Sequence, residues 1–155
     1  MKKIKKIFLS FIVAILFMTQ PFQVMAESNN TFQVTREYLD DGSFFEILIE
    51  SNENQRSSIK NASKTFTFKN ANEEPLWYAK VTANFYYDGN TSSCTSSSAS
   101  GGSYVSEWKI LSKSSSRTGN VASATVTAGA YMGGLYVDSL TVKVLLSCDK
   151  NGNLS

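Results

Sequence analysis

The 155-residue chain contains no histidine. Histidine is the base of the Ser-His-Asp and Cys-His catalytic arrangements, and it supplies ligands to most zinc enzymes. Its absence therefore excludes these arrangements and every histidine-based metal cluster. The chain also has neither of the standard glycine patterns that cradle phosphate groups. We expect no catalytic residues, no cofactor and no metal site, and hence a protein that is not an enzyme.

Histidine-free chemistry has only partial matches in the sequence. Ser106 and Lys109 fit the S-x-x-K pattern of penicillin-interacting serine enzymes, but they fall on a strand pattern, whereas that motif begins a helix. Residues 149–153 resemble a calcium loop with a misplaced glycine. A carboxylate pair for glycoside hydrolysis could be drawn from four acidic residues that otherwise look solvated: Glu73, Glu74, Glu107 and Asp138. Coincidence is the favoured interpretation of all three.

Positive charge is concentrated at the N-terminus. Four lysines among the first six residues precede an apolar run over residues 7–18, and small side chains stand at Val24 and Ala26. This layout predicts a secretory signal peptide over residues 1–26. An uncleaved anchor is the less favoured alternative, because the apolar run is short for a membrane span.

Cleavage after Ala26 would leave residues 27–155 as one secreted domain. The four lysines would be lost with the signal peptide. The remaining chain would then contain 11 of the 15 basic residues and all 13 acidic residues, so the net charge would change from +2 to −2. No basic patch then argues for nucleic acid or, after cleavage, for a membrane. No cysteine lies near the cleavage site to take a lipid anchor. We expect the protein to be extracellular or loosely associated with the cell wall.

Apolar and polar residues alternate along most of the remaining chain. Between residues 77 and 87 the odd positions are apolar or aromatic, and the same period of two recurs at residues 45–49, 66–68, 122–128 and 140–148. Asp-Gly, Gly-Gly and Gly-Asn turn signals separate these runs. The pattern predicts an all-β fold, an antiparallel β-sandwich of about eight strands that is Ig-like or barrel-like. Residues 52–63, rich in Asn and Ser, are predicted to form a loop or linker.

The two cysteines are predicted to form a disulfide. Cys148 has the core-facing parity of its strand, and Cys94 lies in the stretch "TSSCTSSSASGG" just after the longest strand. An exported chain with an even number of cysteines favours a Cys94–Cys148 bond. A flexible linker and a reactive thiol are the alternatives for the serine-rich stretch. A reactive thiol would need a nearby base or cation to form thiolate.

Three aromatic residues form a possible binding surface. Tyr78 and Tyr86 occupy the nominally polar side of the longest strand, and Phe44 could join them. Exposed rings on a sandwich can stack on sugars or anchor a protein. The alternative, which the sequence favours, is that another part of the fold covers them. The leading hypothesis is a secreted interaction module that binds cell-wall polysaccharide or a surface protein. The second is a diffusible effector, such as an antagonistic toxin or an enzyme inhibitor.

Residues 63–155 resemble a family of small exported β-rich proteins from Clostridium-like and other low-GC Gram-positive bacteria. The features that carry the resemblance are "KN" before "LW", an aromatic "YDG" turn, "CTSSS", a run beginning "SKSSSRTGN", and a final cysteine before "NGNLS". The resemblance implies one domain with paired cysteines. It implies no substrate.

Overall fold

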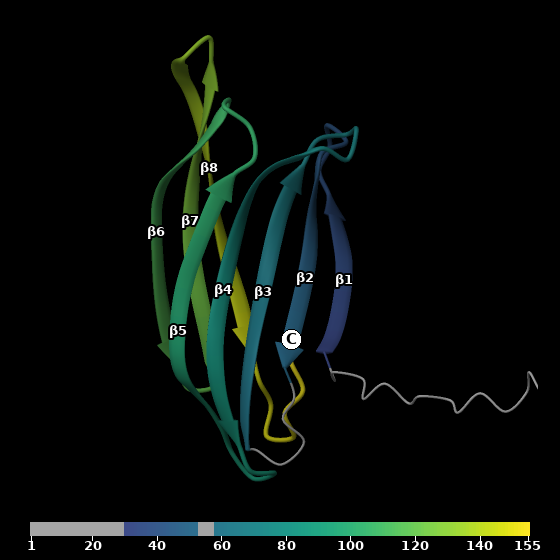
Figure 1. The fold of residues 1–155 in the computed structure, drawn as a ribbon, viewed down its shortest axis with the longest axis vertical. Helices are drawn as coiled ribbons and strands as arrows, with labels where there is room; N and C mark the ends of the chain where they lie inside the picture. The colour runs from purple at the N-terminus through teal and green to yellow at the C-terminus, as the bar shows by residue number, and fades with distance from the viewer. Residues whose placement is uncertain (1–29, 53–57) are drawn as a thin grey trace, which may run out of the picture.

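Eight antiparallel strands form two packed sheets in a computed structural model that describes residues 30–52 and 58–155 (Figure 1). The predicted all-β sandwich of about eight strands in one domain is confirmed. The first sheet has the order β1-β2-β3-β4-β5 and the second the order β6-β7-β8. The strands are β1 (Asn30–Tyr38), β2 (Phe44–Asn52), β3 (Ile59–Lys69), β4 (Pro75–Tyr87), β5 (Ser92–Ser103), β6 (Trp108–Thr118), β7 (Val121–Met132) and β8 (Leu135–Ser147).

The strand order follows the chain within each sheet, so the connections are up-and-down hairpins. The described strands therefore do not have the Greek-key connections that are typical of immunoglobulin domains. Side chains of β6 close the seam between the two sheets at β5. The Arg117 guanidinium donates to the carbonyls of Cys94, at 3.0 Å, and Thr95, and the Ser115 hydroxyl donates to the carbonyl of Ser97 at 3.3 Å. The sandwich is therefore barrel-like on this side, while β1 and β2 extend beyond the second sheet (Figure 1).

The predicted alternation places the core correctly. On β4 the odd-numbered side chains from Trp77 to Phe85 are at most 1% exposed, and they face the buried side of β7. Period-two patterning produces this result because successive strand side chains point to opposite faces. The β7 contribution consists mostly of small residues, which allow the two sheets to approach closely: Ala122, Ala124, Val126 and Ala128.

The segment between β2 and β3 differs from its prediction. Strand β2 continues to Asn52 and β3 begins at Ile59, so residues 59–63 are strand and not the loop predicted for 52–63. Pairing with both β2 and β4 explains the difference, because ladder hydrogen bonds override an unfavourable local composition. Residues 53–57 and the predicted signal peptide lie outside the described residues.

Two lysines interrupt the apolar inner face of β3. Lys60 is buried, and its ammonium group donates to the carbonyl of Gly152 at 2.6 Å, which ties β3 to the C-terminal turn. Burial lowers the pKa of Lys64, whose ammonium group lies 5.9 Å from the centre of the Phe66 ring. The aliphatic stems of such lysines cover apolar surface while the charged groups reach polar surroundings.

Candidate functional site

The three predicted surface aromatics lie on one face, the outer face of the five-stranded sheet, but they do not form one surface. Tyr78 and Tyr86 are eight residues apart on β4, or about 26 Å along a strand. Phe44 is only 2% exposed. The ring of Tyr38 and the guanidinium of Arg36 cover it, each 5.0 Å from the centre of its ring. Phe44 is therefore a packing residue and is not available to a ligand.

Tyr78 also has a packing role. Its side chain is half-buried, and its ring lies 5.8 Å from that of Tyr104. A Cβ atom added to Gly102 on the neighbouring strand would stand 2.8 Å from Cε1 of Tyr78, so the ring lies directly against the β5 backbone. Tyr78 thus fills the space that a missing side chain on β5 leaves open.

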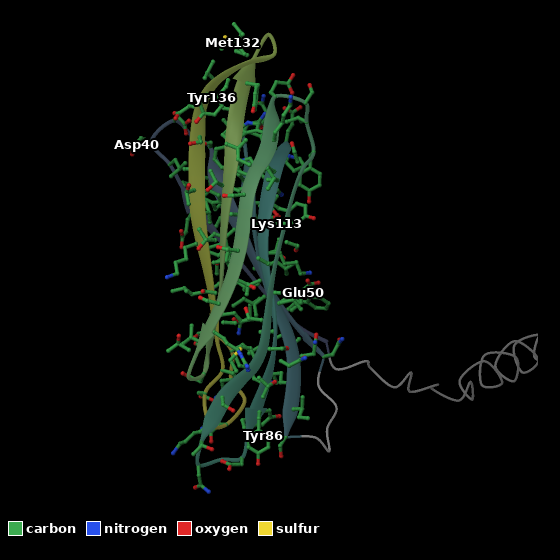
Figure 2. The ribbon with its side chains drawn as sticks, turned by 90° about the vertical axis from the view of Figure 1, so that its left-hand side faces the viewer. Asp40, Glu50, Tyr86, Lys113, Met132 and Tyr136 are labelled. Atoms are coloured by element: carbon green, nitrogen blue, oxygen red, sulfur yellow. The ribbon has the colours of Figure 1, made fainter. Side chains whose placement is uncertain are left out.

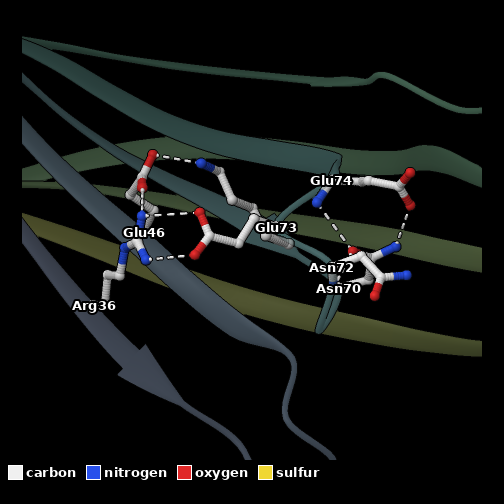
Figure 3. A network of polar contacts seen from close by, with 7 residues as sticks. Arg36, Glu46, Asn70, Asn72, Glu73 and Glu74 are labelled. Atoms are coloured by element: carbon white, nitrogen blue, oxygen red, sulfur yellow. Dashed lines mark hydrogen bonds and ion pairs between the residues drawn. The ribbon is translucent and has the colours of Figure 1, made fainter.

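A network of charged groups occupies the Phe44 end of this face (Figure 3). Glu46 accepts a hydrogen bond from Lys69 at 2.8 Å and one from Arg36 at 3.2 Å, and Arg36 also donates to Glu73 at 3.1 Å. The hydrogen bond from Lys69 is the main reason that the pKa of Glu46 lies below its ordinary value. These ion pairs join β1, β2, β3 and the following turn, so they act as a structural clamp.

The Tyr86 end of the same face carries a row of three asparagines. In the strand register Asn52 of β2 stands opposite Asn61 of β3, and Asn61 stands opposite Asn84 of β4. The Asn61 amide donates to the Asn84 side-chain oxygen at 2.7 Å. Three adjacent strands give the row a length of about 10 Å. The sheet thus lines up amide groups from segments that are far apart in the sequence.

A depression and two aromatic rings flank the asparagine row. The depression has a volume of about 190 Å³ and is lined by Phe32, Glu50, Ser51, Asn52, Asn61 and Ser63. Glu50 accepts a hydrogen bond from the Ser63 hydroxyl at 3.3 Å and lies 3.6 Å from the Lys80 ammonium group. Phe32 of β1 is exposed beside Glu50, its partner on β2, at the Asn52 end of the row. Tyr86, 42% exposed, follows Asn84 on β4 at the other end of the row, and Figure 2 shows Tyr86 close to one end of the molecule. We call Phe32, Glu50, Asn52, Asn61, Asn84 and Tyr86 the asparagine site.

Sequence patterning identifies only Tyr86 among these residues. Asn52, Asn61 and Asn84 each look like an ordinary polar position, because period-two alternation assigns a residue to the outer face without naming its neighbours. Asn52 and Asn61 also fall in the segment predicted as a loop. Only the register between β2, β3 and β4 brings the three amides together. The signal that could locate the row is an antiparallel pairing of residues 44–52 with residues 59–69, which places Asn52 opposite Asn61.

The structure corrects the disulfide prediction, because Cys94 and Cys148 are free thiols. Both belong to the buried core. Their backbone amides bind the two central residues of one turn, the one that joins β6 to β7. The Cys94 amide donates to the carbonyl of Gly119 at 2.7 Å and the Cys148 amide donates to that of Asn120 at 3.2 Å. The fold thus brings the two cysteines to the same turn without bonding them.

Each thiol is directed to a carbonyl of its own segment. The Cys94 sulfur lies 3.2 Å from the carbonyl oxygen of Ser96, and the Cys148 sulfur lies 3.6 Å from that of Asp149. Burial raises the pKa of both thiols. Because the thiolate is the reactive form, both cysteines are expected to be poor nucleophiles in the folded protein. This argues against the reactive-thiol interpretation.

Alkylation should therefore depend on unfolding and not on reduction. We expect the folded protein to react slowly with iodoacetamide, and the urea-unfolded protein to take up two alkyl groups without any reductant, as measured by intact mass. A protein treated with reductant before alkylation is the control and should give the same mass. Uptake by the unfolded protein only after reduction would contradict free thiols and restore the disulfide prediction.

Comparisons with known proteins do not place this chain in a family. No family model, no curated protein and no solved structure matches this chain. In residues 30–52 and 58–155, no three Cys, Asp or Glu side chains gather closely enough to hold a metal ion. The same described part contains no helix long and apolar enough to cross a membrane. The asparagine site is therefore the feature of this chain that bears on its function.

Proposed function

We propose that this protein is an exported, non-catalytic module that binds a polysaccharide, such as a cell-wall glycan, at the asparagine site. The proposal rests on the row of Asn52, Asn61 and Asn84 between the exposed rings of Phe32 and Tyr86. Export rests on the predicted signal peptide over residues 1–26.

Asparagine suits a ligand rich in hydroxyl groups. Each side-chain amide offers two donors and an acceptor, and a sugar hydroxyl both donates and accepts. Because Asn61 uses one amide hydrogen on Asn84, the two side chains hold each other in place. Their remaining donors and acceptors are then already oriented toward a ligand, which lowers the ordering cost of binding.

The flanking groups fit the other surfaces of a sugar. Aromatic rings provide apolar contact area that complements the C–H face of a pyranose, and the exposed rings of Phe32 and Tyr86 stand at the two ends of the row. The Glu50 carboxylate lines the depression beside the row and can accept hydrogen bonds from hydroxyl groups. The site combines a few oriented polar groups with apolar walls, as small-ligand sites usually do.

Retention on isolated walls tests the proposal. We expect the purified domain to bind cell walls prepared from a Gram-positive bacterium and freed of protein. Tyr86→Ala and Asn61→Ala should each weaken binding by about tenfold or more, which corresponds to about 1.4 kcal/mol. The loss reflects a missing stacking surface in the first variant and a broken amide pair in the second.

Tyr78→Ala is the matched control, since it removes the same side chain from the same face of the same strand outside the asparagine site. It should bind walls like the wild type, provided that its circular dichroism spectrum shows a folded protein. Failure of the wild-type protein to bind walls would contradict the proposal. Equal binding by the wild type, Tyr86→Ala and Asn61→Ala would contradict it too.

A further inference from the structure

The β7–β8 hairpin ends in an exposed apolar tip that projects beyond the rest of the sandwich (Figures 1 and 2). Met132 and Leu135 are each 74% exposed, and Tyr136 and Val137 are also exposed. Gly133 and Gly134 form the turn, both with positive φ, and nothing lies within 4 Å of a Cβ atom added to either one. We call residues 131–137 the hairpin tip.

Both faces of the hairpin tip carry apolar or aromatic side chains. Tyr131 and Tyr136 stand opposite each other on one face with ring centres 5.8 Å apart. Met132 and Leu135, which are also paired, point to the opposite face because successive strand side chains alternate. A flat partner could cover only one of these faces. An apolar medium that surrounds the hairpin would cover both.

The order of side chains along the hairpin matches the layers of a lipid bilayer. Met132 and Leu135 are at the end, the tyrosine pair follows, and the first charged residues come next at Asp138, Lys109 and Glu107. The backbone carbonyl of Glu107 accepts a hydrogen bond from the Tyr131 amide at 2.7 Å. The Lys109 ammonium group lies 4.5 Å from the centre of the Tyr131 ring. Tyrosine is enriched at the interface between lipid and water, and charged groups stay at the level of the headgroups. Three residues on each strand reach about 10 Å, the depth of an interfacial insertion.

One basic residue lies beside the tip. Residues 108–147 contain Lys109, Lys113, Arg117 and Lys143 against the single carboxylate of Asp138. Lys113, Lys143 and Arg117 stand opposite Val126, Thr125 and Ala122 of β7, six or more residues from Met132, so they lie away from the tip. At the base of the tip Lys109 is accompanied by the acidic residues Glu107 and Asp138, so the tip offers a partner apolar surface and no excess of positive charge.

From these observations we infer that the hairpin tip is a membrane-contact site, which inserts Met132 and Leu135 into the outer layer of a phospholipid bilayer. The sequence led to the opposite expectation, no membrane contact after cleavage, because net charge does not show where apolar side chains are exposed. Met132 of the tip lies at one end of the molecule, whereas Glu50 of the asparagine site lies near the middle and Tyr86 at the other end (Figure 2). The inference is therefore independent of glycan binding, and both contacts can be made at once.

Co-sedimentation with vesicles tests the inference. We expect the purified domain to bind vesicles of phosphatidylcholine, both alone and mixed with phosphatidylglycerol. The double variant Met132→Ser/Leu135→Ser should lose about tenfold or more of this binding, since two large apolar side chains no longer enter the lipid. Lys109→Gln should weaken binding to the anionic vesicles and leave binding to phosphatidylcholine unchanged.

Leu145→Ser is the matched control, because it removes an exposed leucine from the same strand outside the tip. It should bind vesicles like the wild type, and so should Tyr86→Ala. Unchanged thermal unfolding of each variant shows that the fold is kept. No binding of the wild type to either kind of vesicle would overturn the inference. Equal binding by the double variant would overturn it as well, since charge alone would then explain the contact.

Discussion

Replacing Trp77 by alanine is expected to lower the free energy of unfolding by about 3–5 kcal/mol. Trp77 is fully buried on the inner face of β4. Its ring stacks on that of Trp108 with 5.8 Å between their centres, and it also contacts the rings of Phe45 and Phe68. The loss combines the transfer of a large ring to water with the cavity left between the sheets. Urea denaturation followed by circular dichroism measures it.

Trp77→Phe distinguishes the contribution of the aromatic ring from that of the indole N–H group. The indole Nε1 of Trp77 is buried and has no hydrogen-bond partner among the described residues, so phenylalanine removes an unsatisfied donor while it keeps an aromatic ring. We expect this variant to cost less, about 1–2 kcal/mol. A loss as large as that of Trp77→Ala would show that the indole group makes an interaction that this structure lacks.

Replacing Gly101 by valine is expected to destabilise the sandwich by about 1–3 kcal/mol. Gly101 is on β5 opposite Ala79, where the two sheets are in close contact. A Cβ atom there would stand 2.9 Å from Cγ1 of Val126 and 3.1 Å from the Tyr78 carbonyl oxygen. The added side chain must therefore push β5 away from β7. Thermal unfolding and urea denaturation both report the change.

Ser100→Val is the control for this substitution. Ser100 pairs with Lys80 on the outer face of the same strand, so the variant introduces the same β-branched side chain without entering the space between the sheets. It should change the stability little. If Gly101→Val were as stable as Ser100→Val, the close contact between β5 and β7 would not exist in solution.

The strands follow from local patterns in the sequence. Alternation predicts the buried face of β4 and the core-facing position of Cys148, and turn signals separate the strands. These features are local, because a strand repeats every two residues and a glycine at positive φ can be recognised from its neighbours. Where composition and pairing disagreed, as at residues 59–63, pairing determined the structure.

The candidate site depends on contacts that one strand does not contain. Tyr78, Tyr86 and Phe44 share a face, but a face of this sheet is longer than a binding site. Tyr38 and Arg36 cover Phe44 from the neighbouring strand, and Tyr78 packs on Gly102. Covering and packing depend on contacts between strands, which the parity of one strand does not contain.

The sequence by itself determined the class of fold and the core face of each long strand, and the absence of histidine excluded whole classes of chemistry. Only the tertiary structure decided which polar residues become neighbours, where Met132 and Leu135 project, and that Cys94 and Cys148 remain separate thiols. The division follows from the range of the interactions. Alternation and turns depend on adjacent residues, whereas a row such as Asn52, Asn61 and Asn84 depends on the register of three strands.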